Sequence, residues 1–479
     1  MRKTIKVFLF LFLLNMVACY NSYDLKDKKS ENYIDKSHKS DLEISLSNET
    51  LTCLSCHKIQ TPSIVLQWKS SPHYKNGIGC YECHQAEKKD IDAFYHNGFY
   101  IRVVLSPKTC GKCHVQEAKE FMASYHSKGG KFVESPKNVL GLLTTGVPNA
   151  FVGCARCHGS KVRLDAKGRP IAGTWPNQGI GRYNPDGTQG SCTACHYAHL
   201  FSLKQAREPK TCGRCHQGPD HPDIEIFELS KHGIAWEAHK SEIESKLDRK
   251  YLILGKDYYH APACFTCHMG ATVNGLKTTH DVGSRLSWNL RAPISKHTKN
   301  WKEKRSKMEK VCENCHSISW VKDFYKAFDA YVELYNKKFA IPAKQILTFL
   351  HKKGVLDAIP FNEQVEWDYW HLWHHEGRRG RQGTAMAAAD YSHWQGIYLV
   401  AYNFYMKLLP HADQAVIKAY KEGKISRDVV KQWERFKFSI LNSPEHAWFK
   451  RAQTFKDLED LEKFYLRKYL NDMQNKTFE

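Results

Sequence analysis

The sequence predicts a mostly α-helical protein in two parts. The first, residues 51–320, is rich in cysteine, and the second, residues 321–479, is a helical region without cysteine. Eight Cys-x-x-Cys-His motifs fall in the first part, with Gly- and Pro-rich turns between them. After Ser319, apolar and aromatic residues such as Phe324, Phe328 and Tyr335 recur at helical spacing up to a predicted break at Pro342, and the same pattern returns in 429–473. No stretch alternates polar and apolar residues for long enough to predict a sheet.

The N-terminus predicts an exported protein. Residues 1–18 combine a basic start with an apolar run that is too short to span a membrane comfortably, as in a secretory signal. Small residues before Cys19 resemble a bacterial lipoprotein cleavage site, which predicts a periplasmic protein anchored to a membrane through a lipid on Cys19. Ordinary cleavage nearby is the alternative. Residues 19–50 are rich in Lys, Asp, Ser and Asn, and predict a flexible tether.

The eight motifs place two cysteines three residues apart, with a histidine directly after the second. The paired cysteines are Cys53 and Cys56, Cys80 and Cys83, Cys110 and Cys113, Cys154 and Cys157, Cys192 and Cys195, Cys212 and Cys215, Cys264 and Cys267, and Cys312 and Cys315. The histidines are His57, His84, His114, His158, His196, His216, His268 and His316.

This spacing is typical of covalent haem attachment. On a helical turn both cysteines can reach the vinyl groups of one porphyrin, and the histidine lies beneath the iron as its proximal ligand. Disulfides, zinc sites and thiol exchange also use paired cysteines, but none of them needs a histidine after every pair. The motifs use 16 of the 17 cysteines and leave Cys19 over. The sequence therefore predicts eight covalently bound haem c groups and a largely porphyrin-filled core.

The formal charge of +21 does not predict a nucleic-acid partner. Eight haems would add roughly 16 negative charges through their propionates, which the excess of Lys and Arg would balance. The basic residues are also spread along the chain. An anionic substrate or an acidic redox partner is compatible with this charge.

Each iron also needs a sixth ligand or an open face. An iron between two histidines conducts electrons, whereas an open iron can bind and transform a small molecule. Histidines outside the motifs that stand in short, turn-like contexts are candidate distal ligands, and the alternative for each is a surface or structural histidine. They are His73, His96, His126, His199, His232, His280 and one of the neighbours His374 and His375.

From the first motif to about Leu409 the chain resembles the octahaem hydroxylamine oxidoreductases and their reductive relatives. The resemblance rests on the eight motifs and on four further runs. These are Asn184-Pro185-Asp186-Gly187, Gly218-Pro219-Asp220-His221-Pro222, Thr279-His280-Asp281-Val282-Gly283 and Trp373-His374-His375-Glu376-Gly377-Arg378-Arg379.

The resemblance implies a catalytic haem at the fourth motif, attached through Cys154 and Cys157 with His158 as its proximal ligand. It also implies an Asp-His pair over the open face, and Asp220-His221 is the only Asp-His dipeptide in the chain. The alternative is a turn aspartate beside a loop histidine. The family places a tyrosine in this pocket, for which Tyr258 and Tyr259 are the candidates. Histidine beside a carboxylate suits proton transfer near neutral pH.

The family divides by reaction direction. Hydroxylamine oxidisers crosslink the catalytic haem to a tyrosine of a neighbouring subunit, and the reductive branch lacks this bond. Either Tyr391 is that tyrosine, or the position of the crosslinking tyrosine corresponds to the stretch near Ala385 and this chain has no crosslink. The compact length and the predicted lipid anchor favour the reductive branch, with nitrite or hydroxylamine as substrate.

Two alternatives to this enzyme stay open. One is a pure electron-transfer cytochrome, and the other resembles octahaem tetrathionate or nitrite reductases with a lysine-ligated haem, although no motif here reads Cys-x-x-Cys-Lys. For the enzyme, the expected electron partner is a membrane-anchored cytochrome c or a quinol dehydrogenase. By resemblance the protein is a homotrimer.

Overall fold

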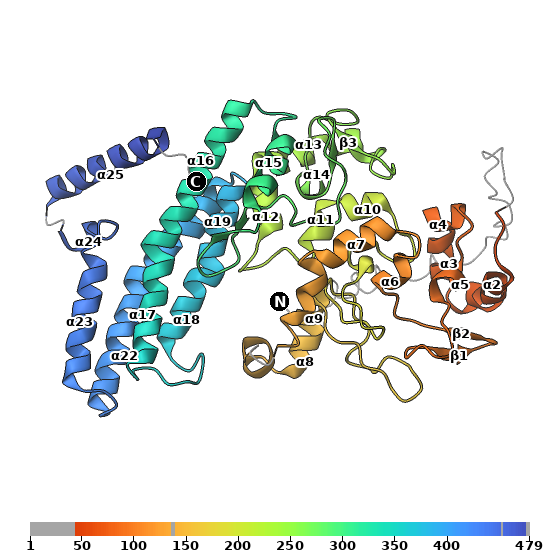
Figure 1. The fold of residues 1–479 in the computed structure, drawn as a ribbon, viewed down its shortest axis with the longest axis horizontal. Helices are drawn as coiled ribbons and strands as arrows, with labels where there is room; N and C mark the ends of the chain where they lie inside the picture. The colour runs from red at the N-terminus through yellow and green to blue at the C-terminus, as the bar shows by residue number, and fades with distance from the viewer. Residues whose placement is uncertain (1–43, 136–138, 452–453, 476–479) are drawn as a thin grey trace, which may run out of the picture. The chain divides into compact units, whose positions relative to one another are not determined.

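The computed structural model describes residues 44–135, 139–451 and 454–475 (Figure 1). The chain divides into two units, 1–45 and 46–479, and every element named below belongs to the second. The predicted signal sequence and Cys19 lie outside the described residues, as does most of the predicted tether, whose last three residues belong to the first described helix. Among the described helices, none is both long and apolar enough to cross a bilayer.

The first elements are short helices that begin at clear sequence signals. Ser47, Ser71 and Ser106 each accept a backbone hydrogen bond as N-caps, and proline occupies the first turn of three of these helices. The elements are α2 (Asn48–Gln60), α3 (Pro62–Lys69), α4 (Pro72–Lys75), α5 (Cys80–His84), α6 (Pro107–Cys110), α7 (Val115–Ala123) and the 3-10 helix η1 (His126–Lys131).

The next part of the chain carries the fourth to eighth motifs on short helical segments joined by loops. These are the π-helix η2 (Val139–Thr144), α8 (Val147–Asn149), the π-helix η3 (Ala150–Cys154), α9 (Ala155–His158), the 3-10 helix η4 (Cys192–Ala194), α10 (Leu203–Arg207), α11 (Pro209–Gly213), α12 (Asp223–Leu229), α13 (Lys231–Glu244), α14 (Cys264–His268) and α15 (Trp301–Cys312).

The described strands form three two-stranded pairings of two or three residues per strand. They are antiparallel β1 (Phe94–His96) with β2 (Phe99–Ile101), parallel β3 (Ile253–Leu254) with β4 (Ala271–Thr272), and antiparallel β5 (Trp288–Asn289) with β6 (Lys296–His297). Helices therefore dominate, and the prediction of a mostly α fold is confirmed.

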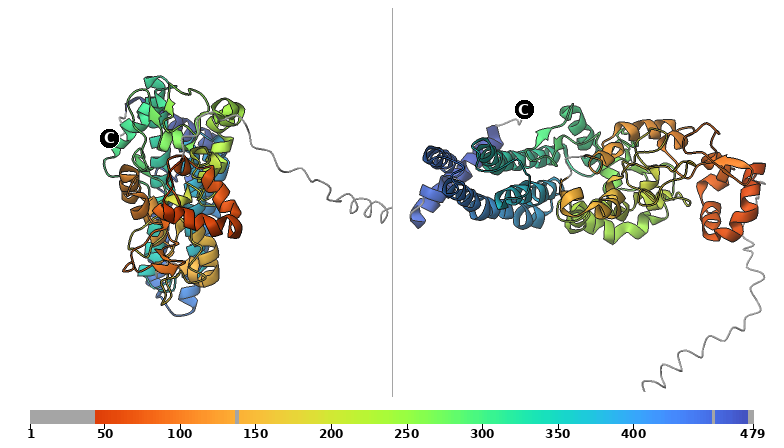
Figure 2. Two further views of the ribbon diagram at one scale, coloured as in Figure 1. Left: turned by 90° about the vertical axis from the view of Figure 1, so that its right-hand side faces the viewer. Right: turned by 90° about the horizontal axis from the view of Figure 1, so that it is seen from below.

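Many of the C-terminal helices lie together around an apolar core of their own, whereas the last helix, α25, buries no residue (Figures 1 and 2). In this core Phe339, Leu350, Phe404 and Trp433 are almost fully buried. The elements are α16 (Ile318–Leu334), η5 (Tyr335–Ala340), α17 (Ile341–Lys352), α18 (Gln364–His371), η6 (Leu372–Glu376), α19 (Gly377–Ala385), α20 (Ala389–Ser392), η7 (His393–Tyr398), α21 (Leu399–Asn403), η8 (Phe404–Leu408), α22 (Leu409–Lys421), α23 (Arg427–Leu441), α24 (Trp448–Arg451) and α25 (Phe455–Asn475).

The helical rod from α16 to α17 differs from the sequence expectation. Pro342 suggests a helix break, but the chain stays helical from residue 318 to 352. The π-helical segment η5 directly precedes α17, and Pro342 lies in the first turn of α17, where a missing N–H leaves no intrahelical bond unmade.

A buried ion pair joins α15 to α16. The Arg305 guanidinium donates to the carboxylate of Asp329, with an Nη2–Oδ1 distance of 2.6 Å, and the Trp288 indole N–H donates to the same oxygen at 2.7 Å. Asp329 is 2% exposed. This contact ties the helix that ends in the eighth motif to the first helix of the C-terminal region.

Candidate haem-binding and catalytic site

Each motif lies in helical backbone. The motif-histidine N–H donates to the carbonyl of the first cysteine at 2.9–3.0 Å in the motifs of His114, His196, His216 and His316. The other motifs lie in α2, in α5, across η3 and α9, and in α14. No disulfide joins any two of the sixteen motif cysteines in the described residues. One helical turn thus presents two thiols and an imidazole together, as covalent haem attachment requires.

Six motif histidines face a second imidazole at nearly the same separation. The ring centroids are 6.0–6.3 Å apart in all six pairs. The pairs are His57 with His96, His84 with His199, His114 with His73, His196 with His280, His216 with His126, and His316 with His232.

This separation fits one iron atom between two imidazoles. With metal–nitrogen bonds of about 2 Å on each side, the two ring centres would lie about 6.3 Å apart. Two imidazoles in van der Waals contact or in a hydrogen bond would lie closer, as the rings of His371 and His375 do at 4.7 Å. Six of the seven candidate distal ligands therefore stand where a bis-histidine haem iron needs them. His216 has two imidazoles at this separation, because its ring centroid also lies 6.1 Å from that of His221.

The remaining two motif histidines, His158 and His268, are in no such pair among the described residues. The ring of His158 lies 5.0 Å from that of Phe132. His268 is buried and directs Nδ1 to the carbonyl of Val282 at 3.3 Å. The seventh candidate, His375, contacts His371 through Nδ1 at 2.8 Å, so the structure does not bring it to a motif histidine.

Contacts between cysteines of different motifs show which motifs are neighbours. The Cys157 and Cys215 thiols lie close enough to shift each other's pKa, which places the fourth motif beside the sixth. Cys212 contacts Cys264 in the same way, which joins the sixth motif to the seventh. Cys195 of the fifth motif is also close enough to Cys212 to affect its own pKa, which burial raises above the usual range. The sixth motif thus lies at a junction.

Tight backbone packing fixes the fourth motif. Gly159, directly after His158, has φ +81°, and a Cβ there would lie 2.3 Å from the Arg182 nitrogen. The buried Arg182 donates from Nε to the Asn184 side-chain oxygen at 2.7 Å and from Nη1 to the Asn177 carbonyl at 2.9 Å. Asn184 belongs to the Asn-Pro-Asp-Gly run singled out in the sequence, so this run helps to hold the backbone behind His158.

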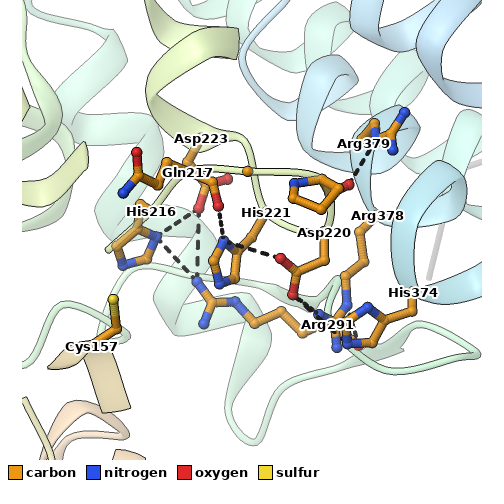
Figure 3. Close-up of polar contacts among 12 residues, drawn as sticks. Cys157, His216, Gln217, Asp220, His221, Asp223, Arg291, His374, Arg378 and Arg379 are labelled. Atoms are coloured by element: carbon orange, nitrogen blue, oxygen red, sulfur yellow. Dashed lines mark hydrogen bonds and ion pairs between the residues drawn. The ribbon is translucent and has the colours of Figure 1, made fainter. Parts of the chain in front are cut away.

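Asp220 and His221 lie in the loop between the sixth motif and α12, close to the fourth motif (Figure 3). Nδ1 of His221 lies 2.8 Å from the Gln217 carbonyl and 3.6 Å from the Asp220 carboxylate. If Nδ1 carries the proton, as the Gln217 carbonyl requires, Nε2 is left as an acceptor. The ring is therefore held by its backbone contact and has one nitrogen free for substrate.

Two further side chains complete the polar pocket around Asp220. Arg378 donates to Asp220 Oδ2 at 3.1 Å, and Nε2 of His374 lies 3.7 Å from the same oxygen. Arg379 donates from Nε to the Pro219 carbonyl at 2.7 Å. The run from Trp373 to Arg379 thus fastens the Asp220 loop to the C-terminal helices, a role that the sequence resemblance did not specify.

Arg291 reaches the pocket from the loop between β5 and β6. Its Nη2 lies 3.3 Å from Nδ1 of His216 and 3.8 Å from the Asp223 carboxylate (Figure 3). Asp223 also accepts from Nδ1 of His216 at 2.7 Å. Sequence reasoning did not select Arg291 or Asp223. Arg291 carries no local signal, whereas Asp223 stands seven residues after a motif histidine and could have been suspected.

The pKa directions show how closely these groups are coupled. Burial, together with the smaller effects of His221 and Arg291, lowers the pKa of His158 to about 4 against the opposing effect of Asp220. Burial also lowers the pKa of His221, although Asp220 opposes this. Burial and Arg378 lower the pKa of His374 to about 2. The pocket therefore contains neutral imidazoles under positive potential from arginine.

The candidate tyrosines lie elsewhere. The Tyr258 hydroxyl is buried and donates to the Thr266 hydroxyl at 3.1 Å beside the seventh motif. Tyr259 is 69% exposed, and its carbonyl accepts from Cys315 of the eighth motif at 3.7 Å. The structure therefore does not bring either residue to Asp220 and His221. Tyr391 is buried within its own chain against Ile226 and Ala388.

Comparisons with known proteins agree with this geometry. Residues 181–363 match the family described as seven times multi-haem cytochrome CxxCH, and residues 17–85 match the cytochrome c554 and c-prime family. A probable nitrite reductase–hydroxylamine oxidoreductase fusion protein of Kuenenia stuttgartiensis is 25% identical over 316 residues, which are 58% of this chain and 35% of the relative. The chain thus spans about a third of the length of that relative.

Two solved structures share the fold. A hypothetical multihaem protein has a TM-score of 0.68 at 23% identity, covering 79% of this chain and 97% of its own. A reducing HAO-like protein complex of Kuenenia stuttgartiensis has a TM-score of 0.55 at 20% identity, covering 79% of this chain and 87% of its own. The solved structures show that the fold is shared, and the eight motifs together with the family match over residues 181–363 indicate a multihaem cytochrome with covalently bound haem c.

Proposed function

We propose that this protein is an octahaem cytochrome that reduces nitrite or hydroxylamine at the haem of the fourth motif, with the other seven haems as electron conduits. One observation carries the proposal. Six motif histidines have a second imidazole at 6.0–6.3 Å, and two, His158 and His268, have none among the described residues. Of these two, His158 is the one whose pKa is affected by both Asp220 and His221.

The residues around His158 suit multi-proton reduction of a small anion. The bound haem would supply an iron that takes up the substrate and the electrons that reduce it. Reducing nitrite to ammonium consumes six electrons and eight protons and releases two waters, so the pocket must deliver protons repeatedly. His221 can accept and return a proton at Nε2, while Asp220 stabilises the charged ring. Arg291 and Arg378 provide the positive potential that attracts nitrite.

The position of Tyr391 supports reduction over hydroxylamine oxidation. The oxidising branch needs a tyrosine that reaches the catalytic haem of another subunit. Tyr391 packs against Ile226 and Ala388 of its own chain and is 8% exposed, so it would have to leave that contact to reach a neighbour. One of the two similar solved structures is titled as a reducing HAO-like complex.

The state of the irons tests this proposal directly. In electron paramagnetic resonance of the purified holoprotein, we expect one high-spin, five-coordinate haem beside low-spin haems, and a carbon monoxide difference spectrum that titrates one iron per chain. Only low-spin irons without a carbon monoxide complex would leave a pure electron-transfer protein. A red-shifted band in the dithionite-reduced spectrum would instead indicate the tyrosine crosslink and favour oxidation.

A pocket variant tests the assignment of His221. We expect His221→Ala to lower the rate of nitrite reduction by about 10²–10⁴-fold, the usual contribution of a positioned acid–base group, with haem content unchanged. The half-exposed His351, which contacts Glu366 at 3.6 Å, provides the control variant His351→Ala with wild-type turnover. Wild-type activity in His221→Ala would refute the assignment.

The export and assembly predictions complete the proposal. The protein would be periplasmic and anchored through a lipid on Cys19, draw electrons from a membrane-anchored cytochrome c or a quinol dehydrogenase, and form a homotrimer. Mass spectrometry of the mature N-terminus and light scattering of the detergent-solubilised protein test the anchor and the trimer. An unmodified N-terminus downstream of Cys19, or a monomeric mass, would remove the respective part.

A further inference from the structure

A cluster of three metal-binding side chains lies outside all the pairs and pockets described above. His239 and Glu242 stand three residues apart on one face of α13, and His260 lies in the segment that leads into the seventh motif. Their ligand atoms all lie within 4.8 Å of one another, and this is the one such group among the described residues. The family resemblance assigns no role to any of them.

The carboxylate of Glu242 bridges the two imidazoles. Oε1 lies 2.7 Å from Nδ1 of His239, Oε2 lies 2.5 Å from Nε2 of His260, and the two rings are 4.7 Å apart. Tetrahedral zinc with bonds of about 2.1 Å separates its ligand atoms by about 3.4 Å. To share one ion, the carboxylate oxygens and the imidazole nitrogens need to move apart by less than about 1 Å. The three side chains are exposed enough for this movement, at 45%, 53% and 33%.

The neighbouring cations do not compete for this carboxylate. Lys240 pairs with Glu237 at 2.6 Å, Lys204 pairs with Glu244, and Lys246 donates to the Asp257 carbonyl at 2.8 Å. Glu242 thus contacts only imidazoles, which are neutral ligands once deprotonated. Two neutral imidazoles and one carboxylate leave a net charge of about +1 on a bound divalent ion, and a fourth position for water.

We propose that His239, Glu242 and His260 form a binding site for a divalent transition-metal ion of the zinc type, separate from the haem irons. The ion would clamp α13 to the segment before the seventh motif. Both elements support the eighth motif. His232, in the first turn of α13, faces His316. The carbonyl of Tyr259, next to His260, contacts Cys315. The clamp would therefore join two supports of the eighth motif.

Zinc binding to the holoprotein tests the site. We expect isothermal titration with Zn²⁺ at pH 7.5 to show one saturable site per chain in the protein stripped with a mild chelator, and zinc to raise the thermal midpoint of unfolding. Because a ligand that binds only the folded state stabilises it, a variant with lower zinc affinity should also show a smaller rise in the thermal midpoint with zinc. His260→Ala and Glu242→Gln should each lower zinc affinity at least tenfold.

The controls separate this site from other histidines and from the haems. His351→Ala, a variant of another half-exposed histidine beside a glutamate, should bind zinc as the wild type does. Equal zinc affinity in the wild type and in a His239→Ala, His260→Ala double variant would overturn the proposal, as would the absence of saturable binding. Loss of one low-spin haem signal in the zinc-free His260→Ala variant would also overturn it, because His260 would then be an iron ligand.

Discussion

A single carboxylate distinguishes the ligand of the sixth motif from the other proximal histidines. Asp223 accepts from Nδ1 of His216, whereas the Nδ1 atoms of His57, His84 and His268 contact a hydroxyl or backbone carbonyls. Although burial favours its neutral form, the hydrogen bond from His216 holds the pKa of Asp223 below its usual range. A carboxylate partner makes an imidazole ligand more basic, which stabilises the oxidised iron.

We therefore expect Asp223→Asn to raise the reduction potential of one haem by roughly 50–100 mV, since about 59 mV corresponds to a tenfold change for one electron. Spectroelectrochemical titration of the holoprotein measures this shift. Thr61→Val, which removes the neutral partner of His57, serves as the control with a smaller shift. An unchanged set of potentials in Asp223→Asn would contradict the role of the carboxylate.

A buried histidine in the C-terminal core should make stability depend on pH. His446 is 1% exposed, and its Nδ1 lies at hydrogen-bond distance, 2.7 Å, from the Tyr405 hydroxyl. Burial lowers its pKa to about 4, against about 6.5 in an unfolded chain. Between these values the unfolded state binds more protons, so the free energy of unfolding falls as the pH drops from about 6.5 to about 4.

Replacing His446 by glutamine should flatten this part of the pH profile, even if the variant is less stable throughout. Thermal unfolding followed by circular dichroism at pH 4.5 and pH 7.5 gives the comparison, with His351→Gln as the exposed control. A pH dependence as steep as that of the wild type would show that other groups are responsible.

At the level of elements, the buried ion pair between α15 and α16 should contribute strongly to the free energy of unfolding. Asp329→Ala would leave the guanidinium of Arg305 buried without its carboxylate and the indole of Trp288 without its acceptor. Breaking a buried ion pair on one side costs about 3–5 kcal/mol.

We expect this loss in the free energy of unfolding of Asp329→Ala, measured by denaturant titration with haem content checked in parallel. The double variant Arg305→Met, Asp329→Leu should lose less, because it buries no unpaired charge. If the single and double variants were equally destabilised, packing volume rather than the uncompensated charge would be the cause.

The elements also show how far the sequence could predict the fold. Helical spacing of Phe324, Phe328 and Tyr335 was sufficient for the C-terminal helices, because those residues face an ordinary apolar core. Pro342 misled, because proline blocks only the interior of a helix and the chain absorbs it with a π-helical segment and a new first turn. Around the motifs, the spacing of apolar residues predicted little of the helical structure, because the positions of the cysteines and histidines organise these short helices.

Within the site, the local sequence could predict a residue's role where the residue type has one main chemical use. Histidines such as His73 and His280 could be proposed as distal ligands from the sequence, but their pairing with His114 and His196 depends on contacts across roughly 40 to 84 residues, which only the fold provides. His374 was singled out from the sequence only as a possible iron ligand, and its contact with Asp220 appears only in the fold. Arg291 reaches His216 and Asp223 from a distant loop, and no spacing rule could have found it.

For the whole molecule, the number of bound haems is the decisive quantity. Eight motifs predict eight thioether-linked groups, and the intact mass of the exported protein should equal that of the processed chain plus eight haems. A second measurement, pyridine haemochrome absorbance against protein concentration, should give the same ratio. A smaller number in both would remove the corresponding motif from the proposed electron path.

The junction at the sixth motif gives the molecule a property that a linear wire lacks. Cys195, Cys157 and Cys264 all approach the cysteines of this motif, so the fifth, fourth and seventh motifs meet there. In the proposed enzyme, electrons held by the haems of the fifth and seventh motifs would pass through the haem of the sixth motif to the substrate at the fourth motif. Such a reservoir could complete a long reduction in one binding event, so that half-reduced nitrogen species are not released to the cell.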